Sequence, residues 1–439
     1  MRTQLLLSYL VLCAALMVSS GLYNRLALLF VVISFGLLVT AAWRYARGGA
    51  AVPESSFNML LLFAVLISIG FWFVGPTSTD PHPAWYESFA QTAAGAALVA
   101  VPLGYSLRQR WPRLAQVLWL AVGMLPIILW FLLPRALPTP PIDVYSFHQS
   151  AAARLLEGIN PYSVFLGTMT HYSEPSGYQY TPANLYPVAL SVFLTGEVRS
   201  GQAFLMAAAA IFLWLVARRM HNATSAGLVT LLFLYHPRSI FVLDHSFTET
   251  IVIAPFALFV FLAAYRLLPS LAALTFGYFI SLKPYLVFLP LPWLIIERRL
   301  RYLLLAAAGA FLPALPFFSS DFTNTVRHGF LFNILHAPFR RDSLTATSLF
   351  AEFCDCQVPL AGWSLLVGAL ATGLTMYFLG KRASLTSFLF AATIIMFSIF
   401  LFGSQAFGGY YYLLTVLLLF LIAASQSLRQ KDVPDLPQV

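Results

Sequence analysis

The stretch from Pro140 to Pro187 holds most of the residues that could do chemistry, and it is the longest polar interruption in an apolar sequence. It holds the ionisable side chains Asp143, His148, Glu157, His171 and Glu174 and a run of tyrosines. Apolar residues recur at helical spacing from Asp143 to Leu155, which predicts a short amphipathic helix. Gly158 and the turn sequence that follows it predict the end of this helix.

Asp143 has two interpretations that the sequence leaves open. As a helix N-cap, its carboxylate would accept hydrogen bonds from backbone N–H groups of the first turn. As a base at the membrane edge, the same carboxylate would take a proton from a hydroxyl group. The two roles conflict, because hydrogen bonds that stabilise the ionised carboxylate also make it a weaker base.

The tyrosines and prolines of Tyr178-Gln179-Tyr180-Thr181-Pro182 and Tyr186-Pro187 close the same stretch. Tyrosine is enriched at both interfaces of a membrane, so these residues have an ordinary interpretation as interfacial anchors. A contact with substrate is the alternative interpretation, and the order of the residues alone does not decide between the two.

A second polar cluster joins two predicted spans, from Tyr235 to Arg238 and from Asp244 to Thr250. It contains His245 and Glu249 as well as Asp244. Ionisable groups so close to hydrocarbon are costly and often mark a functional site. The alternative is an internal Arg–Asp or His–Asp pair that only ties two helices together.

Two basic features complete the set of candidate residues. Lys283, before Pro284, lies between two apolar runs, where a lysine can extend to the interface or bind a phosphate as a point charge. The loop from Asp321 to Thr345 carries a cluster of basic residues, His336, Arg340 and Arg341 among them. This loop is either solvated surface or an anion site.

The elements that must position these residues are membrane helices. The chain has 439 residues, of which 60% are hydrophobic and 9% are charged, with a mean hydropathy of +0.80. Soluble domains carry about 25% charged residues, so a chain this apolar must be a multi-span membrane protein. We expect an all-α polytopic bundle of about 12–14 spans, with juxtamembrane helices in an outer loop. The apolar runs are 4–20, 26–43, 57–74, 87–104, 116–133, 201–217, 223–238, 249–266, 269–283, 285–297, 302–318, 358–379, 384–403 and 410–427.

The distribution of arginine and lysine predicts the orientation. Ala183–Leu194 is too short for a span, which indicates an interfacial helix. With that assignment most Lys and Arg clusters fall on one side, which the positive-inside rule makes cytoplasmic. Both termini and the tail 428–439 are then cytoplasmic, and the loop 134–200 lies outside. The net charge of +9 thus follows from topology and requires no nucleic-acid partner.

Motifs for other chemistry are absent from the sequence. We find no P-loop, no G-x-S-x-G elbow and no H-E-x-x-H zinc site, so ATP-driven or hydrolytic chemistry is not indicated. The pair Cys354-Asp355-Cys356 is spaced too closely for an easy disulfide or a zinc half-site, and we expect unpaired or weakly oxidised thiols there.

The motif Asp143-Val-Tyr145, the helix ending at Asn160-Pro161-Tyr162, and Tyr178-x-Tyr180-Thr181-Pro182 together resemble the first outer loop of GT-C glycosyltransferases. The resemblance is strongest to bacterial polyprenyl-phosphate-mannose-dependent mannosyltransferases. Part of it is also similar to the catalytic subunit of GPI mannosyltransferase I. Many relatives carry two neighbouring acidic residues in this loop, whereas here Val144 follows Asp143, which leaves Asp143 as the candidate at that position.

The resemblance implies a GT-C-like catalytic domain over 116–427, while residues 1–115 would be transmembrane helices of unknown role. The expected reaction is inverting transfer of a sugar, with mannose favoured, from a polyprenyl-phosphate donor to a lipid or glycan acceptor outside the cytoplasm. Asp143 would be the general base. The donor phosphate would meet Lys283, His245, His336, Arg340 and Arg341. The substrate would contact Tyr145, Tyr178, Tyr180, Asp244 and Glu249.

The resemblance calls for no cofactor, and it leaves open whether a divalent metal takes part. The expected location is a bacterial inner membrane, although the same outer side would be the lumen in a eukaryote. The alternative function is a transporter or flippase of lipid-linked glycans. Such a protein would place its ionisable residues near mid-membrane, on broken helices from paired repeats, and no clean repeat is visible.

Overall fold

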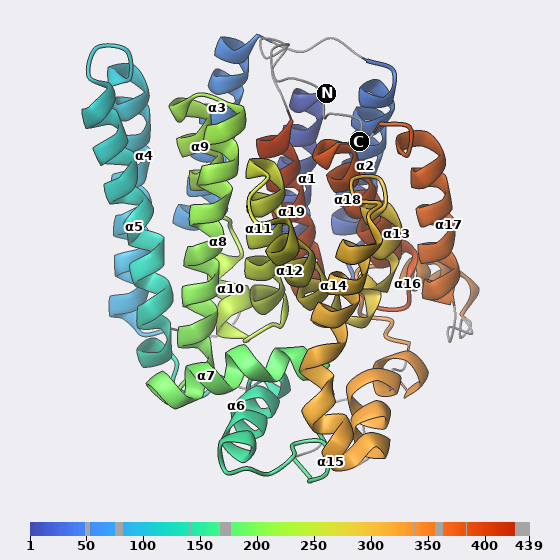
Figure 1. Ribbon diagram of the computed structural model, residues 1–439. Helices are drawn as coiled ribbons and strands as arrows, with labels where there is room; N and C mark the ends of the chain where they lie inside the picture. Colours follow the sequence, from blue (N-terminus) through green and yellow to red (C-terminus); the bar gives the residue numbers. More distant parts are fainter. Residues whose placement is uncertain are drawn as a thin grey trace.

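The computed structural model describes residues 1–48, 53–74, 82–140, 142–166, 177–336, 339–355, 363–382 and 384–425. Within these ranges the regular secondary structure is helical, apart from one isolated antiparallel bridge between Leu22 and Ser343. The expected all-α class is therefore confirmed (Figure 1).

The helices are continued in places by short 3₁₀ segments or, at η4, by a π-helical segment. In chain order they are α1 (Arg2–Ser19), α2 (Arg25–Ala46), α3 (Glu54–Val74), α4 (Ala84–Leu107), α5 (Pro112–Ala136), α6 (Asp143–Leu156), η1 (Pro182–Asn184), α7 (Leu185–Thr195), α8 (Val198–Met220), α9 (Ala223–Leu234), α10 (Ser239–Asp244), α11 (Glu249–Tyr265), α12 (Pro269–Ser281), η2 (Pro284–Phe288), α13 (Pro290–Trp293), α14 (Leu300–Phe311), η3 (Leu312–Ala314), α15 (Leu315–Val326), η4 (Arg327–His336), α16 (Ala346–Cys354), α17 (Trp363–Leu379), α18 (Leu385–Phe402) and α19 (Gly408–Ala424).

Eight helical stretches in the described part of the chain are long and apolar enough to cross a membrane. They are α1 to α5, α8, α18 and the continuous stretch Leu300–Phe332. The helices α9, α11, α12, α17 and α19 are also apolar but shorter. The span predicted at 285–297 is wrong, because prolines at 284, 290 and 292 divide it into η2 and the four-residue α13.

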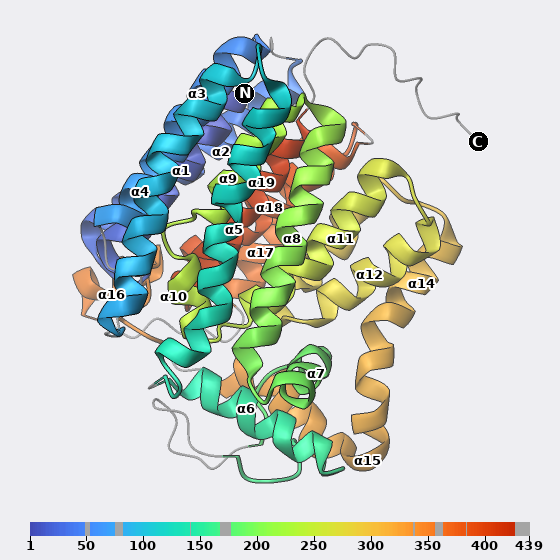
Figure 2. The same ribbon diagram turned by 90° about the vertical axis from the view of Figure 1, so that its left-hand side faces the viewer.

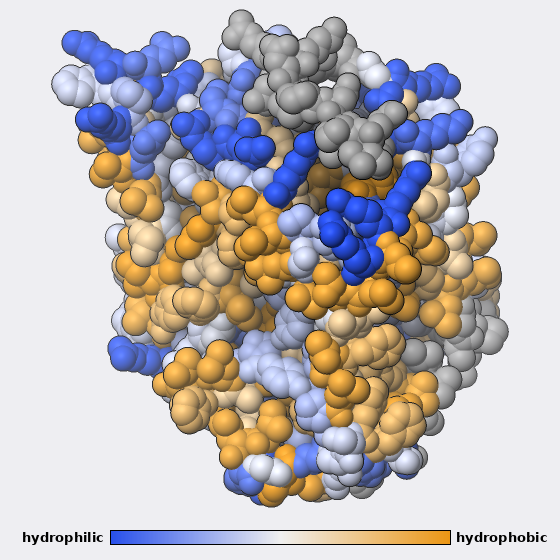
Figure 3. Space-filling view, viewed as in Figure 1, coloured by the Kyte–Doolittle hydropathy of each residue, from blue (hydrophilic) through white to orange (hydrophobic). Residues whose placement is uncertain are grey.

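The two ends of the described chain meet at one end of the bundle. Arg2 donates a hydrogen bond to the backbone oxygen of Ser425 at 2.7 Å. The helices α6, α7 and α15 lie at the opposite end in two perpendicular views (Figures 1 and 2). The most hydrophilic surface gathers mainly at the end that holds the termini, above a broad apolar band (Figure 3). The bundle therefore has the arrangement of an integral membrane protein.

The local sequence explains the two juxtamembrane helices. Asp143 is the first residue of α6 and Ile142 occupies the N-cap, so the predicted N-cap role of Asp143 is displaced by one residue. Beyond α6, Gly158 adopts φ +77°, a left-handed conformation that ends helices readily. As predicted, α7 is short, with 11 residues, and ends before Gly196.

The first four helices pack within the bundle and do not form a separate body. Tyr9 on α1 donates a hydrogen bond to the backbone oxygen of Leu232 on α9 at 2.8 Å. Trp72 on α3 donates one to the backbone oxygen of His236 at 2.7 Å. These hydrogen bonds join helices on either side of the domain boundary predicted at residue 115, and the boundary itself stays a prediction.

One expectation about the cysteines is wrong. Cys354, at the end of α16, is disulfide-bonded. Asp355 follows in a left-handed conformation with φ 45°, which bends the chain directly after Cys354. The residue spacing alone contained no sign of this bend.

Candidate active site

One large cavity brings together many of the predicted site residues, and its volume is about 1410 Å³. It lies among segments that are far apart in the sequence, from the α1–α2 turn to α19. The predicted residues that line it are Asp143, Tyr180, His245, Glu249, Lys283 and Arg340.

Asp143 reaches the cavity because it begins α6. The backbone N–H of Val144 donates a hydrogen bond to Asp143 Oδ1 at 2.8 Å, and the side chain is part of the cavity wall. The residue is half-buried, so its carboxylate can meet a ligand without being fully removed from solvent. A carboxylate in such a position can accept a proton from a bound hydroxyl group.

The Tyr-x-Tyr-Thr-Pro segment positions Lys283. Thr181 Oγ1 and Asn184 Nδ2 both donate hydrogen bonds to the backbone oxygen of Leu282, at 2.9 and 2.7 Å. These bonds satisfy the carbonyl group of Leu282, just beyond the end of α12, which would otherwise be buried without a hydrogen-bond partner. Lys283 follows immediately and lines the cavity beside Tyr180. No pattern in the sequence indicated this role of Thr181 and Asn184.

Lys283 is held by one carboxylate and three aromatic rings. Its Nζ lies 3.0 Å from Glu249 Oε1, and both side chains are nearly buried. The same Nζ lies 5.5, 5.8 and 5.4 Å from the ring centroids of Tyr180, Tyr285 and Tyr410. The faces of these rings attract the ammonium group electrostatically.

Glu249 begins α11, and the structure leaves space for its carboxylate. A Cβ atom added at Gly409 would lie 2.7 Å from Glu249 Oε2, so only glycine fits there without a shift. Tyr285 also donates a hydrogen bond to Glu249 Oε1 at 3.2 Å. The Lys283–Glu249 pair thus depends on the segments around Glu249, Lys283 and Gly409, which are distant from one another in the sequence.

His245 and Arg340 add further polar groups to the cavity wall. His245 Nδ1 is 3.0 Å from the backbone oxygen of Phe241, and the ring stacks near Phe247. Arg340 pairs with Asp342, and its guanidinium lies 4.5 Å from the ring centroid of Phe407. An arginine on an aromatic face can turn its donors towards an anion with little rearrangement.

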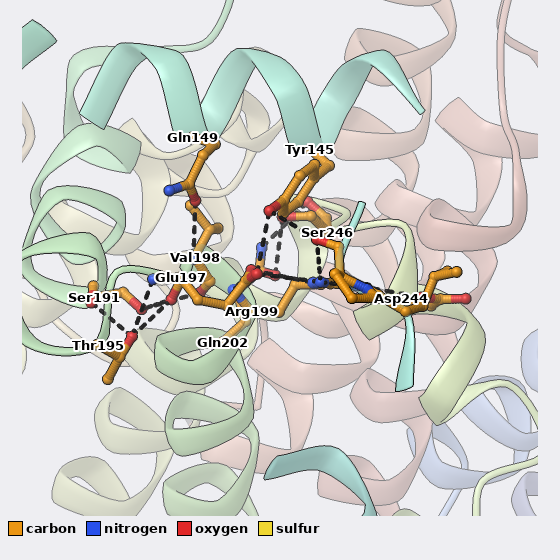
Figure 4. Close-up of polar contacts among 12 residues, drawn as sticks. Tyr145, Gln149, Ser191, Thr195, Glu197, Val198, Arg199, Gln202, Asp244 and Ser246 are labelled. Carbon is orange, nitrogen blue, oxygen red and sulfur yellow. Dashed lines mark hydrogen bonds and ion pairs between the residues drawn. The ribbon is translucent and has the colours of Figure 1, made fainter. Parts of the chain in front are cut away.

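Tyr145 and Asp244 lie outside the cavity wall, in a buried polar network (Figure 4). Arg199 contacts Asp244 at 3.5 Å and Glu197 at 3.1 Å. Tyr145 donates a hydrogen bond to Glu197 at 3.1 Å, and its ring covers the Arg199 guanidinium. This network matches the alternative of an internal ion pair and ties α6, the helix of Asp143, to α8 and α10.

The other predicted residues are also apart from the cavity. Arg341 is exposed and pairs with Asp355 at 3.2 Å. Tyr178 is buried behind Tyr180. The side chain of His336 lies outside the described residues.

His148 supports this wall from behind, and the sequence did not assign it a role. Its Nδ1 is 2.8 Å from the Tyr178 hydroxyl, and its ring stacks on Tyr180 with 4.8 Å between centroids. Burial, together with the nearby positive charge of Lys283, lowers the pKa of His148 to about 3. The imidazole is therefore neutral at physiological pH and packs as an aromatic support for Tyr180.

Away from these polar groups the cavity wall is strongly apolar. Helices α12, α13, α14 and α15, with the segment η2, supply much of this wall. Representative lining residues are Phe276, Ile280, Leu303, Ala307, Phe322 and Leu365. The cavity therefore combines a few charged side chains that can meet a polar group with a large apolar surface that suits hydrocarbon.

No group of three or more His, Cys, Asp or Glu side chains within the described ranges is placed to hold a metal ion. Comparisons with known proteins give no relative to set beside this geometry, since no family model, curated protein or solved structure matches the chain.

Proposed function

We propose that the chain is a membrane glycosyltransferase of the GT-C type. It transfers a sugar, with mannose favoured, from a polyprenyl-phosphate donor to a lipid or glycan acceptor. The reaction takes place at the end of the bundle formed by α6, α7 and α15, on the extracytoplasmic side of a bacterial inner membrane.

The amphipathic cavity carries this proposal. Its polar part contains two carboxylates, Asp143 and Glu249, and two cations, Lys283 and Arg340. Its apolar part is lined by membrane helices. A ligand that fills both parts must join an anionic or polyhydroxylated head to a long hydrocarbon, which is the chemistry of a lipid-linked sugar phosphate.

The polar residues match the needs of an inverting transfer. Asp143 accepts the proton of the acceptor hydroxyl as its oxygen bonds to the anomeric carbon. The bond from that carbon to the phosphate oxygen breaks, and its electron pair leaves with the lipid phosphate. Lys283 and Arg340 stabilise the charge that grows on this leaving group.

The decisive experiment measures sugar transfer by the purified protein in liposomes. A panel of radiolabelled polyprenyl-phosphate sugars is supplied together with a membrane extract as the source of acceptors. Label in a new glycan or glycolipid supports the enzyme. Movement of the donor across the bilayer with no new glycosidic bond supports the flippase alternative and contradicts the proposal.

The orientation gives a first testable prediction. Cysteines placed at Glu157 and Lys381, in a background without the native cysteines, should react with an impermeant thiol reagent from opposite sides of the membrane. Both positions are exposed, and Glu157 directly follows α6, at the end of the bundle opposite the termini. Lys381 lies two residues beyond α17, next to Arg382, which donates a hydrogen bond to the backbone oxygen of Ala46 at the end of α2. In whole cells only the Glu157→Cys variant should be labelled, because the basic end is cytoplasmic. Labelling of both cysteines in intact cells would contradict the orientation.

Arg340 and Arg341 provide a matched pair for a second prediction. Arg340→Ala should lower transfer at limiting donor about tenfold or more, since it removes a charged donor from the cavity wall. Arg341→Ala should leave transfer within about twofold of wild type, because exposed ion pairs such as Arg341–Asp355 contribute little. Initial rates over a range of donor concentrations test both. Normal donor use by both variants would show that this loop acts only as solvated surface.

A further inference from the structure

The turn between α1 and α2 forms part of the cavity wall, although the sequence assigned no role to the first four helices. Ser20 and Leu22 both line the cavity. They lie far in sequence from Asp143 and Lys283, yet they border the same space. The N-terminal hairpin is therefore a component of the candidate site.

The same turn is joined through its backbone to the loop that carries Arg340. Leu22 forms an antiparallel bridge with Ser343. The backbone N–H of Tyr23 donates a hydrogen bond to the backbone oxygen of Asp342 at 2.8 Å. The carboxylate of Asp342 in turn pairs with the Arg340 guanidinium. A continuous series of contacts thus leads from the turn to the cation in the cavity wall.

Side chains strengthen this junction at its outer edge. Tyr23 donates a hydrogen bond to Glu352 Oε2 at 2.5 Å, and Arg25 Nη2 donates one to Oε1 of the same carboxylate at 2.7 Å. Glu352 belongs to α16, which follows the Arg340 loop directly. The hydrogen bonds from Arg25 and Tyr23 lower the pKa of Glu352, so the carboxylate is ionised at neutral pH. The turn therefore holds both ends of the segment from Arg340 to Glu352.

A close approach of two backbones fixes the position of the turn. Gly21 adopts φ +84°, and a Cβ atom added there would lie 2.0 Å from the backbone nitrogen of Gly408. Gly408 follows Phe407, the ring on which the Arg340 guanidinium lies. A side chain at position 21 would therefore separate the turn from the very segment that supports Arg340.

We propose that the α1–α2 turn is a positioning element of the active site. It closes one wall of the cavity and holds the Arg340–Ser343 loop so that Arg340 faces the phosphate of the donor. The identity of that anion rests on the proposed function, whereas the positioning of Arg340 does not.

A labelling experiment tests the positioning without any substrate. Arg340→Cys is made in a background without native cysteines, and its rate of reaction with a methanethiosulfonate reagent is measured. Adding Gly21→Ala or Glu352→Gln should raise this rate about fivefold or more, because the loop loses contacts that restrict its opening. Gly48→Ala is the matched control, since Gly48 also has a positive φ, +73°. Gly48 lies just beyond the far end of α2, and a Cβ atom added there would meet only the tip of the Arg382 side chain, at 3.7 Å.

Arg341→Cys gives the second control. Arg341 is already exposed, so its labelling rate should not change in any of these backgrounds. Unchanged labelling of Arg340→Cys in both the Gly21→Ala and Glu352→Gln proteins would overturn the proposal. If Gly21→Ala fails to fold, Glu352→Gln decides alone, because it removes only an exposed contact.

Transfer assays supply a readout that a purely structural role would not change. Glu352→Gln should raise the apparent KM for the donor severalfold with little change in kcat, and this effect should vanish in an Arg340→Ala background. An equal effect in both backgrounds would contradict action through Arg340. If the wild-type protein transfers no sugar from any donor, the proposed function fails, and the labelling result still decides the role of the turn.

Discussion

Replacing Asp143 by asparagine is expected to lower sugar transfer by about 100-fold or more, because an amide cannot accept the proton of the acceptor hydroxyl. The substitution is nearly isosteric. The amide oxygen of the Asp143→Asn variant can still accept the hydrogen bond from the Val144 N–H that Asp143 Oδ1 accepts at 2.8 Å. The start of α6 should therefore persist, and Tm and donor binding should stay close to wild type.

Glu157→Gln is the control for this experiment. Glu157 follows the same helix but is exposed and pairs locally with Arg154 at 3.0 Å. Its substitution should leave the transfer rate unchanged. Near-normal turnover by the Asp143→Asn protein would refute the assignment of the base. Glu249 would then be the next candidate, because it also lines the cavity, whereas Asp244 is fully buried in its pair with Arg199.

Loss of Lys283 is expected to have the second large effect. Lys283→Met should reduce kcat by about 100- to 1000-fold if the ammonium group stabilises the departing phosphate. The single substitution also leaves the Glu249 carboxylate buried without its cation, which costs about 3–5 kcal/mol of folding stability. Lower activity of this variant alone would thus have two explanations.

The double variant Lys283→Met/Glu249→Gln separates them. Neutral groups at both positions remove the uncompensated charge, so Tm should return close to the wild-type value. Transfer should nevertheless stay as low as in Lys283→Met, since no cation faces the leaving group from this position. Recovery of activity together with stability would show that the Lys283–Glu249 pair is purely structural. Thermal unfolding in detergent and single-turnover transfer rates measure the two quantities independently.

Composition and periodicity were sufficient to predict the class of fold and the local elements around Asp143. An apolar chain in a bilayer must satisfy its backbone hydrogen bonds within each helix, so long apolar runs become helices in any context. The α6 helix and its stop at Gly158 were predicted because their causes are local: an amphipathic pattern and a residue that adopts a positive φ readily. The span predicted at 285–297 was wrong because the prediction weighed the hydropathy of this run above Pro284 at its start and the two prolines, Pro290 and Pro292, within it.

The membership of the candidate site was decided by tertiary packing. The sequence presented Asp244 and Glu249 as equivalent carboxylates, and Arg340 and Arg341 as equivalent cations. The structure brings Glu249 and Arg340 to the cavity, buries Asp244 against Arg199, and leaves Arg341 on the surface. The local backbone and the elements packed against it determine which of two nearby side chains faces a cavity, and residue spacing carries little of that information.

The sequence by itself thus determined that this protein is a helical membrane bundle with a long polar segment rich in ionisable residues. The contacts among Lys283, Glu249 and the tyrosines, and those of the α1–α2 turn with the Arg340 loop, were decided by the tertiary structure alone. The hydrogen bond from Tyr23 to Glu352 joins residues 329 positions apart, and such a pair forms only when the helices between them have packed. No local pattern can encode a partner that is chosen by the packing of the whole bundle.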